Sequence, residues 1–210
     1  MKNHKKFTRD LLKVGYAKNS KEESKRLHQL GMTKDTSLSQ RKDKVYVDKN
    51  GKAYIVYRGT NPTDVRDLAT DAAIAVGLGR FTPRFKNGKR LARKVKEKYG
   101  DQNVAAYGHS LGGALAIESG VDERVTYNKA VGVEGIGKQM RRGQKDYRNK
   151  NDLISSLSQF SKYKNKKGED GGTHNERVET GGDFLSAHSL DSLHWNCFSV
   201  WIIKILLFVS

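Results

Sequence analysis

The 210-residue chain is poor in cysteine and proline, and it has no long apolar run near its start. Its single cysteine, Cys197, excludes an internal disulfide and a zinc site built from cysteines. The basic N-terminus, MKNHKKFTRDLLKVGYAK, lacks the apolar stretch of a secretory signal peptide. Hydrophobic residues make up 36% of the chain, which is lean but too apolar for a wholly disordered protein. Length and composition together favour one compact domain with a modest core.

Positive charge is abundant instead, and it is clustered. The chain has 40 basic and 23 acidic residues, a net charge of +17. Three segments carry all of the excess: 1–52 has a net charge of +9, 80–100 of +8 and 138–168 of +8. Such clustering favours an anionic partner, either a phospholipid surface or nucleic acid. The alternative is a solubilising surface around an unrelated site.

The pattern of apolar residues predicts strands that alternate with helices. Residues 44–48 and 53–58 are expected to form a hairpin around Asn50-Gly51. Residues 84–99 are predicted to form an amphipathic helix with a basic outer face, because Leu91, Val95 and Tyr99 recur every four positions. Further strands are expected at 103–107 and 124–133, with a strand end within 147–157, and the polar stretch 161–183 is interpreted as loop.

This alternation predicts an α/β fold, a mostly parallel sheet flanked by helices, with a helical N-terminal segment. We expect three parts: a basic helical segment at 1–40, the α/β domain at 41–194 and an apolar tail at 195–210. The tail, WNCFSVWIIKILLFVS, has sixteen residues and includes Lys204, whereas a membrane-spanning helix needs about twenty apolar residues. A core element, a membrane-surface anchor and an extension outside the fold all stay open for it.

The most informative motif is Gly108-His109-Ser110-Leu111-Gly112-Gly113, which follows an apolar strand and precedes a helix of small residues. A nucleophilic serine must project from a sharp strand-to-helix turn so that a histidine can reach it. Gly108 and Gly112 remove the side chains that would collide in such a turn. The helix that starts behind Ser110 directs backbone N–H groups at an oxyanion, and the Leu111 N–H is the expected donor. His109 is expected to pack beneath the turn.

The stretches GHSLGGALA at 108–116 and YIVYRGT at 54–60 resemble the class 3 (fungal-type) lipase family of α/β hydrolases. The resemblance covers roughly residues 40–194 and implies an α/β-hydrolase fold. It also implies that Thr60 supplies the second oxyanion donor. For residues 61–83 two interpretations stay open, the lid of the family and a plain connecting helix. The asparagine-rich, basic texture is similar to that of lipase-like proteins from large DNA viruses.

The resemblance further implies a catalytic triad in the chain order serine, acid, histidine. Asp152 and Asp146 are the acid candidates, and Asp152 is preferred because its context, an aspartate followed by apolar and serine residues, is similar to that of the family. His188, in SAHSLDSL, is preferred over the two other downstream histidines, which are His174 and His194.

The predicted function is therefore a serine-dependent carboxylic ester hydrolase, a lipase or esterase acting on triacylglycerol or phospholipid through an acyl-enzyme. No metal or organic cofactor is implied. The expected partners are the lipid or ester substrate and an anionic membrane surface, while the charge does not exclude nucleic acid. An intracellular or virion-associated location, with peripheral membrane association, is expected over secretion.

Two alternatives stay open at this point. A basic protein could bind nucleic acid or a membrane on an inactive hydrolase scaffold. A peptidase or thioesterase would use the same triad, because fold does not determine function.

Overall fold

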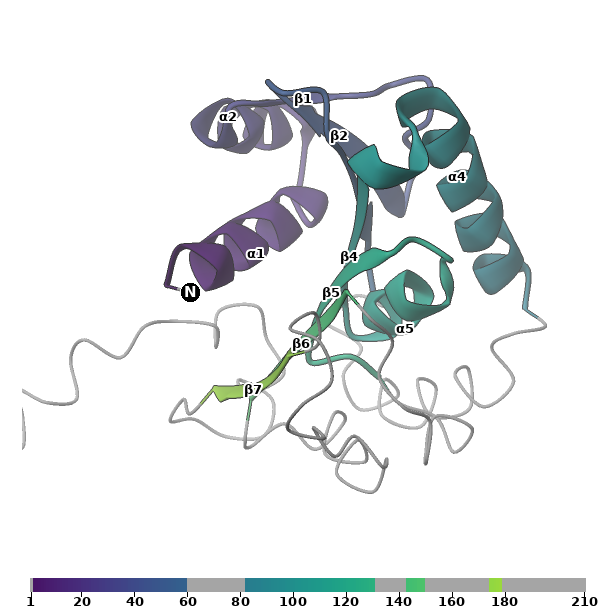
Figure 1. The fold of residues 1–210 in the computed structure, drawn as a ribbon. Helices are drawn as coiled ribbons and strands as arrows, with labels where there is room; N and C mark the ends of the chain where they lie inside the picture. The colour runs from purple at the N-terminus through teal and green to yellow at the C-terminus, as the bar shows by residue number, and fades with distance from the viewer. Residues whose placement is uncertain (1, 60–81, 131–142, 150–173, 179–210) are drawn as a thin grey trace, which may run out of the picture.

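The computed structural model describes residues 2–59, 82–130, 143–149 and 174–178 (Figure 1). The segment 61–83 lies almost wholly outside these residues, and the apolar tail lies wholly outside them. Within the described residues the helices are α1 (Lys2–Gly15), α2 (Ser20–Leu30), α4 (Pro83–Tyr99), α5 (Leu111–Glu118) and the short 3₁₀ helix η3 (Asp101–Asn103). The strands are β1 (Met32–Lys34), β2 (Asp43–Asp48), β3 (Ala53–Tyr57), β4 (Val104–His109), β5 (Glu123–Tyr127), β6 (Gln144–Asn149) and β7 (His174–Val178).

In the described part of the chain the seven strands form one sheet, in the order β1-β2-β3-β4-β5-β6-β7. The first three strands pair antiparallel, and β2 and β3 form the predicted hairpin. From β3 onward every neighbouring pair is parallel. The predicted α/β fold with a mostly parallel sheet is therefore confirmed.

Helices cover both faces of the sheet, with α1 and α2 on one side and α4 and α5 on the other (Figure 1). Side chains of a strand alternate between its two faces, so one strand serves both layers. On β3, Tyr54 and Val56 join the core under α1, whereas Ile55 and Tyr57 join the core under α4 and α5. The central strands β3 and β4 are consequently buried on both faces.

The N-terminal segment packs directly on the sheet. Leu11, Leu12 and Val14 of α1 are buried against the tyrosines and valines of the central strands. The side chain of Asn19 caps α2 by accepting from the Glu22 N–H at 2.9 Å. Gly31 ends α2 at a φ of 64°, a conformation that favours glycine. The predicted boundary at residue 40 stays a prediction, but the packed face of α1 belongs to the sheet's core.

One strand lies where the sequence indicated loop. Residues 161–183 were expected to lack regular structure, yet β7 pairs in parallel with β6 from His174 to Val178. Four of its five residues are polar, so the segment lacks the alternation of apolar and polar residues by which a strand is recognised. The ladder forms through backbone N–H and C=O groups, which every residue in this segment supplies.

An ion pair fastens α4 to the start of β2. The guanidinium of Arg84 donates to both carboxylate oxygens of Asp43, and it also reaches the Arg58 carbonyl at 3.1 Å. The Asp43 side chain is only 1% exposed. Burial raises the pKa of Asp43, and the Arg84 guanidinium opposes that rise. The pair therefore stabilises a buried charge next to the end of β3.

We predict that Arg84→Met lowers the free energy of unfolding by about 3 kcal/mol or more at neutral pH, because it leaves the Asp43 carboxylate buried without its partner. Urea unfolding followed by circular dichroism measures this loss. The deficit should shrink in acid, since a neutral carboxyl costs less to bury than a charged one.

The matched control is Arg93→Met, which removes an arginine from the same helix. Arg93 is 72% exposed and pairs with Glu97 at 3.6 Å, so its loss should change the free energy of unfolding by less than about 1 kcal/mol. Equal losses in the two variants would contradict a special role for the buried pair.

Candidate active site

Ser110 stands at the turn between β4 and α5 in a strained backbone conformation. Its φ is 56° and its ψ is −127°, outside the regions that residues with a side chain normally adopt. Its side chain is buried, and within the described residues its Oγ has no hydrogen-bond partner. Backbone strain and an unpartnered buried hydroxyl both cost stability, and both features concentrate at functional sites.

Close backbone packing explains the glycines around Ser110. A Cβ atom on Gly108 would lie 2.0 Å from the Gly112 carbonyl oxygen, and one on Gly112 would lie 2.0 Å from the Tyr57 carbonyl oxygen. Neither contact is possible for real atoms, so the turn requires glycine at both positions. The α5 helix can therefore start directly against the end of β3, as the G-x-S-x-G spacing predicts.

Hydrogen bonds hold the strained residue from several sides. The Ser110 N–H donates to the Tyr127 carbonyl at 3.2 Å. The Ser110 carbonyl accepts from the N–H groups of Gly113 at 2.9 Å and Ala130 at 3.0 Å. These partners come from α5 and from the end of β5, so the turn is fixed by the neighbouring strand as well as by its own helix.

One of the expected oxyanion donors, the Leu111 N–H, lies at this turn. Leu111 is the first residue of α5, so its N–H has no acceptor within the helix. Gly59 follows β3 and approaches so closely that a Cβ on it would lie 2.9 Å from the Ser110 Cβ. Thr60, the second expected donor, is the next residue along the chain and lies outside the described residues.

Tyr16, just beyond the end of α1, bridges the two turns. Its hydroxyl accepts from the Gly59 N–H at 2.7 Å and lies 3.1 Å from Nδ1 of His109. Arg58 stacks its guanidinium 4.9 Å from the centre of the Tyr16 ring. Burial raises the pKa of Tyr16 to about 12, so its hydroxyl stays protonated at neutral pH. The residue that follows the N-terminal helix thus links the Gly59 turn to the Ser110 turn.

His109 packs beneath the turn, as expected. Its ring stacks on Tyr127 with the centroids 5.8 Å apart and contacts Tyr16 edge-on. The side chain is buried. These contacts with Tyr16 and Tyr127 support the turn from below.

Asp146, one of the two acid candidates, is already committed to a buried cluster. Its carboxylate accepts from the Thr126 hydroxyl at 2.6 Å, from the Gln144 amide at 2.8 Å and from the Lys129 ammonium. The residue is 5% exposed. These contacts tie β5 to β6 and occupy the carboxylate, which weighs against Asp146 as the residue that orients a catalytic histidine.

The parallel strands β4 to β7 end at one edge of the sheet, the edge where Ser110 stands. The preferred acid, Asp152, is the third residue after the end of β6, and the preferred base, His188, is the tenth after the end of β7. Both lie outside the described residues. His174 opens β7 opposite Lys145, so it lies at the other end of these strands, away from Ser110.

The sequence did not predict three sets of contacts that hold the site and the strands around it. These are Tyr16, the Arg84–Asp43 pair and the Asp146 cluster. Each joins segments far apart in the chain, and no local motif marks them. The one usable signal was the amphipathic pattern of α1, whose buried face indicates packing on a core.

A family model described as "Phospholipase-like: Tle-like phospholipase domain" matches residues 8–152. The match spans more than half of the chain and includes the second half of α1, the Gly59 and Ser110 turns, and the strand before Asp152. The chain belongs to this family. Membership supports a hydrolase of the esterase or lipase kind, whereas the resemblance to class 3 lipases and to viral proteins stays a prediction. A search of curated proteins finds no match.

Solved structures give distant likenesses to this Tle-like phospholipase domain. A predicted CIB-like hydrolase from Thermoplasma acidophilum is 14% identical with a TM-score of 0.41, covering 80% of this chain and 92% of its own. A carboxylesterase from Mesorhizobium loti is 11% identical with a TM-score of 0.39, covering 86% of this chain and 100% of its own.

For the Tle-like domain we predict that Tyr16→Phe lowers the free energy of unfolding by about 1–3 kcal/mol, because the Gly59 N–H loses its acceptor. Chemical denaturation measures the change. Tyr107→Phe is the matched control, because this buried tyrosine lies under the same helix and contacts the rings of Phe7 and Tyr54. If the Tyr16→Phe protein is as stable as the Tyr107→Phe protein, the Tyr16 hydroxyl does not stabilise the fold through Gly59.

Proposed function

We propose that this protein is a serine-dependent carboxylic ester hydrolase that acts on phospholipids, with Ser110 as the nucleophile. The observation that carries the proposal is the Ser110 turn. Ser110 sits on a strained backbone at the start of a helix, which is the arrangement that a nucleophile elbow requires. Its buried hydroxyl has no hydrogen-bond partner among the residues that the structure describes. A merely structural serine would gain stability from a relaxed backbone and a hydrogen bond.

The order of the strands supports Asp152 as the acid and His188 as the base. Residues that follow β4, β6 and β7 emerge at the same edge of the sheet, in the chain order serine, acid, histidine. Three strand spacings, roughly 14 Å, separate β7 from β4. Ten residues extend to roughly 33 Å at most, so the segment between Val178 and His188 is long enough to return to Ser110.

In the proposed reaction the His188 imidazole takes the proton from Ser110 Oγ as the oxygen attacks the ester carbonyl. The Leu111 N–H and Thr60 stabilise the oxyanion of the tetrahedral intermediate. The intermediate expels the alcohol, which receives the proton from His188, and an acyl-serine remains. Water, deprotonated by His188, then attacks this ester and releases the carboxylic acid and the free serine. Asp152 orients the imidazole and stabilises its protonated form.

Phospholipid is the favoured substrate because the matching family is described as phospholipase-like and because the net charge of +17 suits an anionic lipid surface. Triacylglycerol has a neutral head, so the same charge offers it no electrostatic advantage. The protein should therefore release fatty acid from phosphatidylglycerol vesicles faster than from emulsified triacylglycerol of the same acyl chain, measured by free fatty acid titration.

The central prediction is that Ser110→Ala lowers hydrolysis of p-nitrophenyl acyl esters at least about a thousandfold. It should also abolish labelling by a fluorophosphonate, which needs an activated serine. Ser24→Ala, an exposed substitution on α2, is the control and should leave both readouts unchanged. Undiminished turnover in a folded Ser110→Ala protein would refute Ser110 as the nucleophile. Absence of both turnover and labelling in the unaltered protein would favour a binding function on an inactive scaffold.

A second prediction separates the histidines. His188→Ala should reduce turnover about a thousandfold or more, as expected for loss of the general base, whereas His174→Ala should leave turnover within about twofold, because His174 lies at the far end of the strands. Circular dichroism checks that both variants fold. If His174→Ala loses turnover and His188→Ala keeps it, His174 is the base, and the base does not come from the sheet edge where Ser110 stands.

A further inference from the structure

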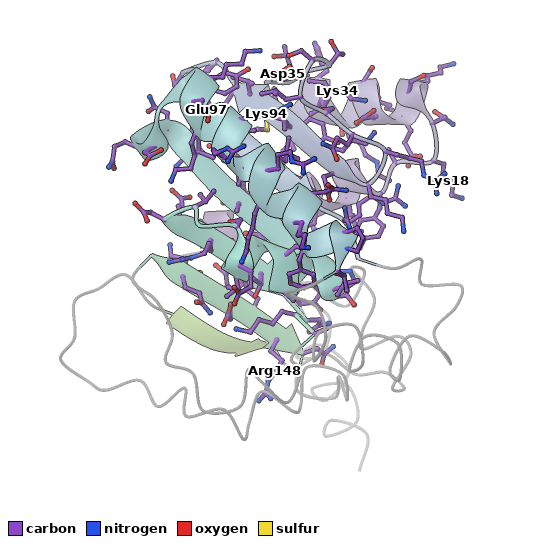
Figure 2. All side chains as sticks on the ribbon, turned by 90° about the vertical axis from the view of Figure 1, so that its right-hand side faces the viewer. Lys18, Lys34, Asp35, Lys94, Glu97 and Arg148 are labelled. Atoms are coloured by element: carbon purple, nitrogen blue, oxygen red, sulfur yellow. The ribbon has the colours of Figure 1, made fainter. Side chains whose placement is uncertain are left out.

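The helix α4 divides its residues sharply between two faces. Phe85, Leu91, Ala92 and Val95 are buried against the sheet and α5. The rest of the helix carries eight basic residues and one acidic residue, a net charge of +7. Figure 2 looks onto this helix, with Lys94 and Glu97 labelled on it. The packed face builds the core, and the outer face carries charge far beyond what solubility needs.

Some of these charges are matched by acids. Lys98 pairs with Asp35 at 2.7 Å, Lys96 with Asp101 at 3.2 Å and Lys89 with Glu118 at 3.6 Å. Arg93 and Glu97 pair with each other along the helix. These pairs account for the charge near the ends and sides of α4.

A row of three exposed residues is left without such a match. Lys86, Arg90 and Lys94 recur every four positions, so they lie in line along one stripe of the helix. Within the described residues none of the three has a carboxylate partner in an ion pair. We name Lys86, Arg90 and Lys94 the basic row.

The basic row works against the helix that carries it. Like charges four positions apart repel each other. Basic residues in the first turn also face the positive end of the helix dipole, and α4 has no acidic residue there. A row that costs helix stability and forms no ion pair with the described residues is consistent with a role toward an external anion.

The basic helix is not typical of the molecule's surface. The groove between α1 and α2 is also lined by charged residues, but acids are interleaved among its bases. Asp10 pairs there with Lys6 at 2.7 Å, and Glu22 pairs with Arg26 at 2.6 Å. Acids therefore offset part of the positive charge in this groove, whereas no ion pair offsets the basic row within the described residues.

The row also begins near the candidate active site. Arg84 contacts the Arg58 carbonyl, one residue before Gly59, so the first turn of α4 lies at the edge of the sheet where Ser110 stands. Lys86 is two residues further along α4. A surface that docks on the basic row therefore lies beside the edge where the substrate would enter.

We propose that the outer face of α4 is a docking surface for anionic phospholipid membranes, with the basic row as its centre. The inference rests on the proposed function, since a phospholipid hydrolase must reach a substrate held in a bilayer. A membrane is favoured over single-stranded nucleic acid because the outer face of α4, apart from the half-buried Tyr99 at its end, has no aromatic side chain on which bases would stack. Three cations in a straight row suit a flat array of head groups.

The test measures vesicle binding in the Ser110→Ala protein, so that no lipid is hydrolysed during the experiment. Cosedimentation is compared between phosphatidylcholine vesicles and vesicles that contain phosphatidylglycerol, at physiological ionic strength. The protein should bind the anionic vesicles only. The triple substitution Lys86→Gln, Arg90→Gln and Lys94→Gln should weaken this binding roughly 100-fold, from about fivefold for each basic residue.

A matched control removes the same charge from the opposite face. Lys18, Lys21 and Lys25 are exposed at the start of α2, and their triple replacement by glutamine also lowers the net charge by three. This control should weaken vesicle binding less than about tenfold. Equal weakening by the two triple variants would overturn the proposal, because binding would then follow net charge and not a particular face.

Two further outcomes are decisive. Absence of binding to anionic vesicles would overturn the docking surface, as would an α4 triple variant that loses binding to a short DNA duplex while it keeps binding to vesicles. With Ser110 restored, the α4 triple variant should hydrolyse soluble p-nitrophenyl esters at the normal rate. Failure of the docking surface and failure of the proposed hydrolase are thereby separated, since the first changes vesicle binding and the second changes ester turnover.

Discussion

The structure depends on a close approach of backbone between the end of β3 and the start of α5. Gly112 lies against the Tyr57 carbonyl, and Gly108 lies against Gly112 itself, at separations that leave no room for a side chain. This contact allows a helix to begin at once after β4 and forces Ser110 into its strained conformation. The same contact brings the Gly59 turn beside the serine. A relaxed turn would separate Ser110 from Gly59.

Strain of this kind persists only if the surroundings hold it. The Ser110 carbonyl and N–H are bound by α5 and by β5, and the Gly59 turn is held by the Tyr16 hydroxyl. Arg84 secures the same strand end through the Arg58 carbonyl. Segments from the first sixth of the chain to its middle therefore converge on one turn, which makes the N-terminal helix part of the candidate site's support.

The sequence predicts those features that depend on residues close together in the chain, and it does not predict contacts between distant segments. The Ser110 turn needs glycines within two residues, so a short motif identifies it, and the hairpin at Asn50-Gly51 is local in the same way. Tyr16 acts on residues 43 and 93 positions away, and nothing in its own neighbourhood marks it. The strand β7 pairs through its backbone and is mostly polar, so its side chains give no periodicity to detect.

The positive charges of α4 lie on its outer face, away from the apolar residues that pack in the core. On α4 the apolar residues recur at helical spacing and fill one layer of the fold, while the cations occupy the remaining positions. Repulsion along the outer face weakens the helix, but burial of Phe85, Leu91 and Val95 against the sheet compensates for it. Tertiary packing can thus maintain a helix whose surface sequence alone would favour unfolding. A helix stabilised from beneath is free to present unmatched charge, and here that charge begins beside the edge of the sheet where Ser110 stands.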